Sequence, residues 1–205
     1  MGAMQRQTTA RVVGALFLTA TAAGIISAVL LEPDSIGDSA YKAPAGALMV
    51  LVMSVAIALI PPTLFPVIKQ FGEASALAYI VARTVEVVLL LPATIGPLMT
   101  LAPGSAHADA ARTVTQIYDL WGYTGSQVFF CLGAALLNAL LFRSRLVPRW
   151  ISGWALVAVV PYLADAVLVM FDVLDVSSPI HATLVVPMAV NEMVLAIWLL
   201  AKGLA

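Results

Sequence analysis

The amino-acid sequence predicts an all-α, polytopic membrane protein, a bundle of six transmembrane helices with both termini in the cytoplasm. Of its 205 residues, 62% are hydrophobic and only 10% are charged, and its mean hydropathy is +1.02. Soluble domains carry about 25% charged residues, so this chain cannot cover a water-exposed surface. The same composition excludes an intrinsically disordered chain, which needs low hydrophobicity, and a nucleic-acid-binding protein, which needs a basic face.

Six apolar runs are long enough to cross a bilayer, since a membrane helix needs about 20 mostly apolar residues. Six such spans would use nearly all of the hydrophobic residues, so we predict one six-helix transmembrane domain over residues 1–205 with short loops. Residues 85–91 do not alternate between apolar and polar, which argues against membrane-spanning β-strands. The predicted spans cover residues 12–31, 45–66, 75–99, 117–142, 150–171 and 181–201.

The first run, 12–31, is expected to be a membrane helix that is retained. Basic residues precede it, as they precede a secretory signal peptide, but the run is longer than a signal peptide needs and no A-x-A-like cleavage site follows. Ala20, Gly24 and Ala28 recur at four-residue spacing, which would let another helix backbone approach closely in lipid. The same spacing also arises by chance in alanine-rich chains.

Prolines end or interrupt four of the later elements, because each removes a backbone hydrogen bond. We expect the second span to reach its cytoplasmic end among Pro61, Pro62 and Pro66. Inside the third, fifth and sixth spans a proline produces either a packing kink or the broken helix that transporters use at their sites. These positions are Pro92, Pro97, Pro161 and Pro187.

The fourth span contains Cys131, the single cysteine of the chain, so no intramolecular disulfide can form.

The fifth span follows an arginine-rich loop, which indicates the orientation of the protein because cytoplasmic loops carry an excess of basic residues. Seven basic residues fall on the side of the termini and two on the other side. The seven are Arg6, Arg11, Lys69, Arg143, Arg145, Arg149 and Lys202, and the two are Lys42 and Arg112.

Three ionisable residues lie at bilayer depth, where each costs about 2.5–3.5 kcal/mol on insertion scales. Arg83 and Glu86 are three residues apart and share a helix face, and Glu86 lies about 17 Å from the cytoplasmic end of its span. Glu192 lies at similar depth in the sixth span, beside Asn191. We expect these four residues to form a buried ligand or proton site, with the third and sixth helices as neighbours. The alternative is a structural ion pair that fixes helix register.

A second polar group is expected nearer the outside. Asp165 and Tyr162 share a face of the fifth span. Asp119 lies at the outer end of the fourth span, and His181 begins the sixth. Together they could line an acidic outer vestibule. One histidine among scattered carboxylates does not predict a metal site, and we expect neither metal nor cofactor.

Motifs that would identify an enzyme are missing from the sequence. It contains no H-E-x-x-H, G-x-S-x-G, P-loop or G-x-G-x-x-G pattern. No catalytic residue is therefore predicted, and an enzyme would have to work with carboxylates, Arg83 and tyrosines alone.

Five blocks of the chain form a recognisable pattern. They are residues 11–18, 20–25, the Arg83-x-x-Glu86 pair, 144–154, and 187–195 with Lys202-Gly203. In these blocks the chain resembles an uncharacterised bacterial membrane family, domain of unknown function 4386. The resemblance implies a multi-pass protein of the bacterial inner membrane and supplies no activity. Asn191 stands where the family favours Gln, and Asp165 where it favours small or apolar residues.

Three functions remain open from sequence. The first is a transporter or channel-like protein for a small solute, ion or proton that uses the Arg83, Glu86 and Glu192 cluster. The second is a binding or sensing module for a lipophilic ligand such as a lipid or quinone, since small helical bundles hold such ligands between helices. The third is an intramembrane enzyme with Glu86 or Glu192 as acid or base. The lipid bilayer is the expected partner, and homo-oligomerisation is left open.

Overall fold

The computed structural model describes residues 3–31, 41–99, 113, 123–176 and 178–205, apart from the side chains of Ala3, Pro97 and Tyr123. The described residues form helices and turns, with no β-strand among them. The helices are α1 (Ala3–Leu30), α3 (Lys42–Ile68), α4 (Glu73–Leu90), α5 (Pro92–Met99), α7 (Tyr123–Ser144), α8 (Arg149–Met170) and α9 (Pro179–Ala201), with a 3₁₀ turn at Lys69–Phe71.

Six segments of the described chain are long and apolar enough to cross a membrane, so the protein is a multi-pass membrane protein. Large apolar side chains on their outward faces are exposed, as lipid-facing residues are: Val157 is 72% and Val160 64% exposed. The segments are Met4–Leu30, Lys42–Phe71, Glu73–Gly96, Thr124–Ser144, Arg149–Met170 and Pro179–Ala201. The prediction of an all-α bundle with six spans is confirmed.

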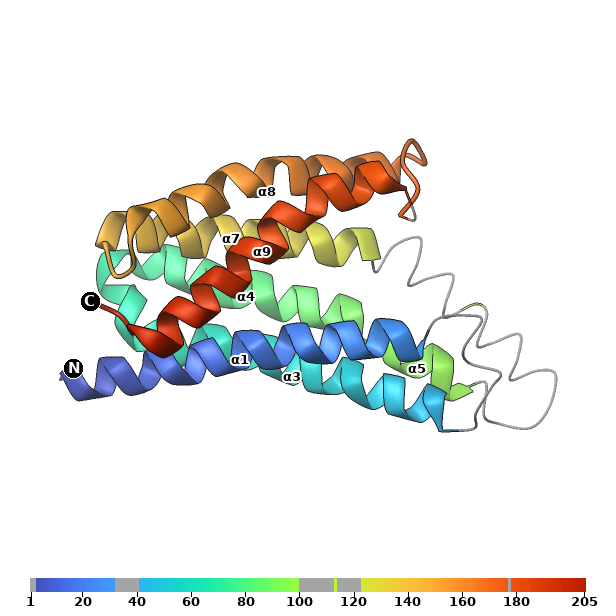
Figure 1. The fold of residues 1–205 in the computed structure, drawn as a ribbon, viewed down its shortest axis with the longest axis horizontal. Helices are drawn as coiled ribbons and strands as arrows, with labels where there is room; N and C mark the ends of the chain where they lie inside the picture. The colour runs from blue at the N-terminus through green and yellow to red at the C-terminus, as the bar shows by residue number, and fades with distance from the viewer. Residues whose placement is uncertain (1–2, 32–40, 100–112, 114–122, 177) are drawn as a thin grey trace.

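The six long helices form a closed ring in chain order. Each packs against the next, α1 on α3, α3 on α4, α4 on α7, α7 on α8 and α8 on α9, and α9 closes the ring against α1. Figure 1 shows the helices side by side with the two termini at the same end of the bundle. We call this the terminal end, and the opposite end, which holds Leu30, Lys42 and Met170, the distal end.

Local sequence signals set several helix ends. Ser178 caps α9 by accepting a hydrogen bond from the Ile180 backbone N–H at 3.1 Å, with Pro179 at the first helical position. At the other end of α9, Gly203 adopts φ +79°, the left-handed conformation in which glycine commonly stops a helix. Arg145 takes the same role after α7 with φ +57°, although a non-glycine residue there is uncommon.

The prolines act differently from one another. Pro92 divides the predicted third span into α4 and α5, with a turn at Leu91. The second span was expected to end among its prolines; Pro61 and Pro62 lie inside α3, which ends at Ile68, two residues after Pro66. Each proline removes one backbone hydrogen bond, but Ile60, Leu64 and Val67 are buried in the hydrophobic core, and this packing stabilises the helix.

The terminal half of the ring is filled by a hydrophobic core to which every long helix contributes. It joins Val13 of α1, Ile60 of α3, Tyr79 of α4, Leu137 of α7, Ile151 of α8 and Leu195 of α9 with the residues buried around them, and we call it the terminal core. α1 begins nine residues before its predicted span, since Ala10 and Val13 in its first half are fully buried there.

Candidate functional site

The distal half of the ring holds an open cavity of about 1210 Å³, which we call the central cavity. All six long helices and α5 line it. Its lining on α1 runs from Phe17 to Val29, and on α4 from Arg83 to Leu90. The cavity therefore extends from the middle of the bundle toward the distal end, and the terminal core lies between the cavity and the terminal end.

Arg83 and Glu86 form an ion pair at the floor of this cavity. Arg83 Nη1 lies 3.0 Å from Glu86 Oε2, and each residue is only 4% exposed. The pair comes from one face of α4, as the three-residue spacing requires. Arg83 also stacks on α7: its guanidinium carbon lies 5.3 Å from the centre of the Phe130 ring, which is within the range of a cation–π contact.

Close packing between α4 and α7 fixes the stem of Arg83. A Cβ atom added to Gly133 would lie 2.9 Å from Arg83 Cδ, so the arginine passes directly over the glycine. Tyr79, one turn before Arg83 on α4, is fully buried and interacts electrostatically with Arg83 and with both glutamates. The arginine is thereby positioned by residues of two helices.

Glu192 faces the same cavity from α9. It is half-buried, lines the cavity, and is close enough to Arg83 to interact electrostatically. Both residues lie about 14–15 Å from the terminal ends of their helices at 1.5 Å per residue. We expected α4 and α9 to be neighbours; instead α4 packs mainly on α3 and α7, and α9 on α1 and α8. Arg83 and Glu192 line the same cavity from helices that are not adjacent in the ring.

Two residues of the cavity wall hold a buried polar atom with no hydrogen-bond partner in the described part of the chain. The atoms are Arg83 Nε and Gln127 Oε1, while Glu86 Oε2 is held by its ion pair with Arg83. An unsatisfied buried polar atom costs about 1–3 kcal/mol, so native proteins keep few of them. Gln127 is 5% exposed and was missed from sequence, although a glutamine inside a membrane span is itself a signal. Phe130 gave no such signal, because an aromatic residue is ordinary in an apolar helix.

Asn191 does not belong to this cluster. Its side-chain nitrogen donates a hydrogen bond to the Ile151 carbonyl of α8 at 2.9 Å, and the residue is 1% exposed. It lies on the face of α9 that packs against α8 and is not among the residues lining the central cavity. Adjacent residues of a helix point in different directions, so Asn191 and Glu192 lie on different faces of α9.

The residues expected in an outer vestibule separate into two places. Asp165 is fully buried and its Oδ1 lies 2.9 Å from His181 Nδ1, which joins α8 to α9. Tyr162 lines the central cavity instead, with its ring 5.0 Å from that of Phe130. Asp119 lies outside the described residues. Asp165 and His181 thus form a bridge between two helices.

Nothing in the described residues forms a metal site, since no group of three or more His, Cys, Asp or Glu side chains comes together there. Cys131 is buried in α7.

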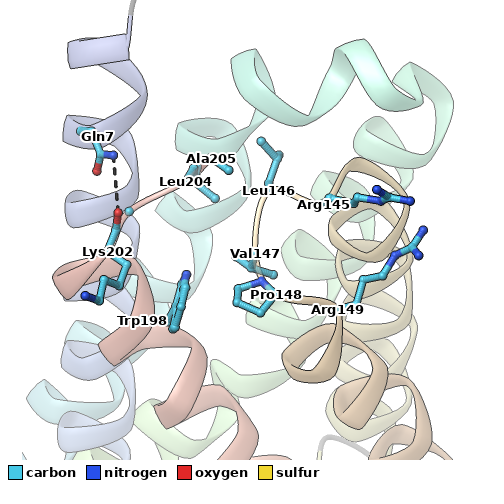
Figure 2. A pocket seen from close by; sticks show the side chains of 11 residues that line it. Gln7, Arg145, Leu146, Val147, Pro148, Arg149, Trp198, Lys202, Leu204 and Ala205 are labelled. Carbon is cyan, nitrogen blue, oxygen red and sulfur yellow. Dashed lines mark hydrogen bonds between the residues drawn. The ribbon is translucent and has the colours of Figure 1, made fainter.

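A smaller cavity of about 620 Å³ lies at the terminal end, between the α7–α8 loop and the last residues of the chain. Arg145, Arg149 and Lys202 line it, and Gln7 Nε2 donates a hydrogen bond to the Lys202 carbonyl at 3.5 Å. Figure 2 shows both guanidinium groups pointing away from Lys202 and from Leu204 and Ala205. Because its basic groups do not converge, this cavity is a weaker candidate for a binding site than the central one.

The comparison with protein families gives one match. The model of the family described as Domain of unknown function (DUF4386) matches residues 12–203, which is nearly the whole chain. No curated protein and no solved structure matches the chain.

Proposed function

The chain belongs to the DUF4386 family, whose description assigns no activity, and we propose that it is a cell-membrane transporter for a small solute. The solute binds in the central cavity at the layer of Arg83, Glu86 and Glu192, and a change in the terminal core then opens the opposite side. Both termini lie in the cytoplasm, by the excess of basic residues at the terminal end.

The observation that carries this proposal is a large cavity that reaches buried charges and stops there. Arg83 and Glu86 are each 4% exposed at its floor. Costly ionisable residues inside a membrane bundle typically mark solute or proton pathways. The apolar terminal core closes the ring below them, which is the arrangement expected of a transporter open to one side. A continuously open channel does not fit this core.

A receptor-like module for a lipophilic ligand is the second candidate. It is favoured by the apolar part of the cavity wall, which includes Ile25, Met53 and Ile57. Such a module holds its ligand from one side and never opens the terminal core.

Cysteine labelling separates the two functions without knowledge of the solute. In a Cys131→Ala background, Thr21→Cys places a thiol in the central cavity, and Val13→Cys places one in the terminal core two helical turns away. A charged, membrane-impermeant methanethiosulfonate reagent is added to one side or the other of oriented vesicles.

A transporter exposes its binding layer to both sides in turn. We therefore expect Thr21→Cys to react from the distal side and Val13→Cys to react, more slowly, from the terminal side. If Val13→Cys stays unreactive while Thr21→Cys reacts, the receptor-like module is favoured and transport is contradicted. Retention of a single elution peak for each variant excludes misfolding as the cause.

A further inference from the structure

With Arg83, Glu86 and Glu192 all ionised, the central cavity carries one negative charge in excess. Its charged lining residues are Arg83, Glu86 and Glu192. Arg83 and Glu86 neutralise each other at 3.0 Å. Glu192 also interacts with Arg83, but a single guanidinium cannot neutralise two carboxylates. A charge buried without a counter-charge is costly, so the cavity favours a positively charged occupant.

The other polar group of the wall points to the same chemistry. Gln127 lines the cavity and is only 5% exposed, and its Oε1 has no hydrogen-bond partner among the described residues. This oxygen is an acceptor, like the carboxylate of Glu192, and cannot donate. An N–H donor or a cationic group suits both oxygens, whereas an anion would be repelled by the carboxylate of Glu192.

Most of the remaining wall is apolar. α1 supplies Phe17, Ile25 and Val29, and α3 supplies Val50 and Met53. A volume of about 1210 Å³ exceeds what a hydrated metal ion fills and is large enough for an organic ligand, since such pockets usually measure about 300–1,000 Å³. An apolar body joined to the cation would bury its surface here favourably.

We propose that the ligand of the central cavity is an organic, amphipathic cation with a single positive charge, which Glu192 neutralises. Its apolar part lies against α1 and α3. This inference names the substrate class of the transporter proposed above and rests on that function for transport, but not for binding.

A proton is the natural competitor for the same place, because protonation also removes the excess charge of Glu192. The titratable and charged groups that face Glu192 are Tyr79, Arg83 and Glu86 of α4 and Tyr162 of α8. The cavity lining contributed by α1, α3 and α7 is free of ionisable side chains. Cation binding is therefore expected to weaken as the pH is lowered.

The test is equilibrium binding of two probes of one shape and opposite charge, tetraphenylphosphonium and tetraphenylborate, to the purified protein in a non-ionic detergent. Binding to empty micelles is subtracted. We expect the phosphonium cation to bind with about one site per chain and the borate anion not to bind. Glu192→Gln should weaken cation binding by about tenfold or more, because it removes one partner of a buried charge pair.

Glu73→Gln is the matched control. It removes the same charge from the exposed first turn of α4, away from the cavity, and should leave cation affinity unchanged. Equal binding of cation and anion to the parent protein overturns the proposal even if the Glu192 variant does not fold, and so does undiminished cation binding by a folded Glu192→Gln. Cation binding without two-sided labelling keeps the ligand class and rejects transport.

Discussion

Arg83 shows how far residue-level reasoning reaches from sequence. Its pairing with Glu86 follows from their three-residue spacing on a helix, and the structure has the pair at 3.0 Å. Its contacts with Phe130 and Gly133 could not be predicted, because they depend on which helix packs against α4. Sequence spacing specifies neighbours on one helix, and packing specifies the rest.

Breaking this pair should be costly, and removing it whole should not. Arg83→Gln leaves Glu86 buried without its partner, so we expect the free energy of unfolding to fall by about 3–5 kcal/mol. In the double variant Arg83→Gln, Glu86→Gln, no charge of the pair remains, and the loss should be clearly smaller than for the single change. Unfolding in detergent, followed by circular dichroism, measures both.

Arg143→Gln serves as the control, because Arg143 is exposed in the last turn of α7. It should change stability by no more than about 0.5 kcal/mol. A double variant as unstable as the single one would show that the ion pair is not what stabilises this layer.

At the scale of elements, hydropathy located all six membrane segments but not their ends. The first span was predicted from residue 12, whereas α1 begins at Ala3. The third was predicted as one helix and is divided at Pro92, since proline lacks the N–H that continues a helix. Helix ends depend on single residues and caps, which averaged hydropathy does not detect.

The contact between α1 and α9 closes the ring and depends on a glycine. A Cβ atom at Gly14 would lie 2.7 Å from the Ala196 carbonyl oxygen and 2.9 Å from Leu200 Cγ. We expect Gly14→Ala to push the helices apart and to lower the free energy of unfolding by about 1–3 kcal/mol. Thermal unfolding in detergent provides the measurement.

Gly153 of α8 is the matched control for this change. A Cβ atom there would lie 3.6 Å from Phe142 Cε2, an ordinary contact. Gly153→Ala should raise stability by about 0.4–1 kcal/mol, because alanine restricts the unfolded chain. Equal effects of the two substitutions would contradict the close approach of α1 and α9.

At the scale of the whole molecule, the order of helices around the ring was not readable from sequence. Apolar helices in lipid give little sequence indication of which partner each one takes. The expectation that the third and sixth helices pack together therefore failed, while the depth of their charged residues was predicted from counting along each helix. The depth of a residue follows from its position along one helix. That Arg83 and Glu192 line the same cavity follows from how the helices are arranged in the ring.

The most direct measurement of the central claim is transport itself. The protein is reconstituted into vesicles with an acidic interior, and uptake of labelled 1-methyl-4-phenylpyridinium, an amphipathic cation with one charge, is followed over time. A proton leaving through Glu192 should drive the cation inward, so the parent protein and Glu73→Gln should accumulate it, and Glu192→Gln should not. Uptake by the parent no faster than by protein-free vesicles would contradict the account.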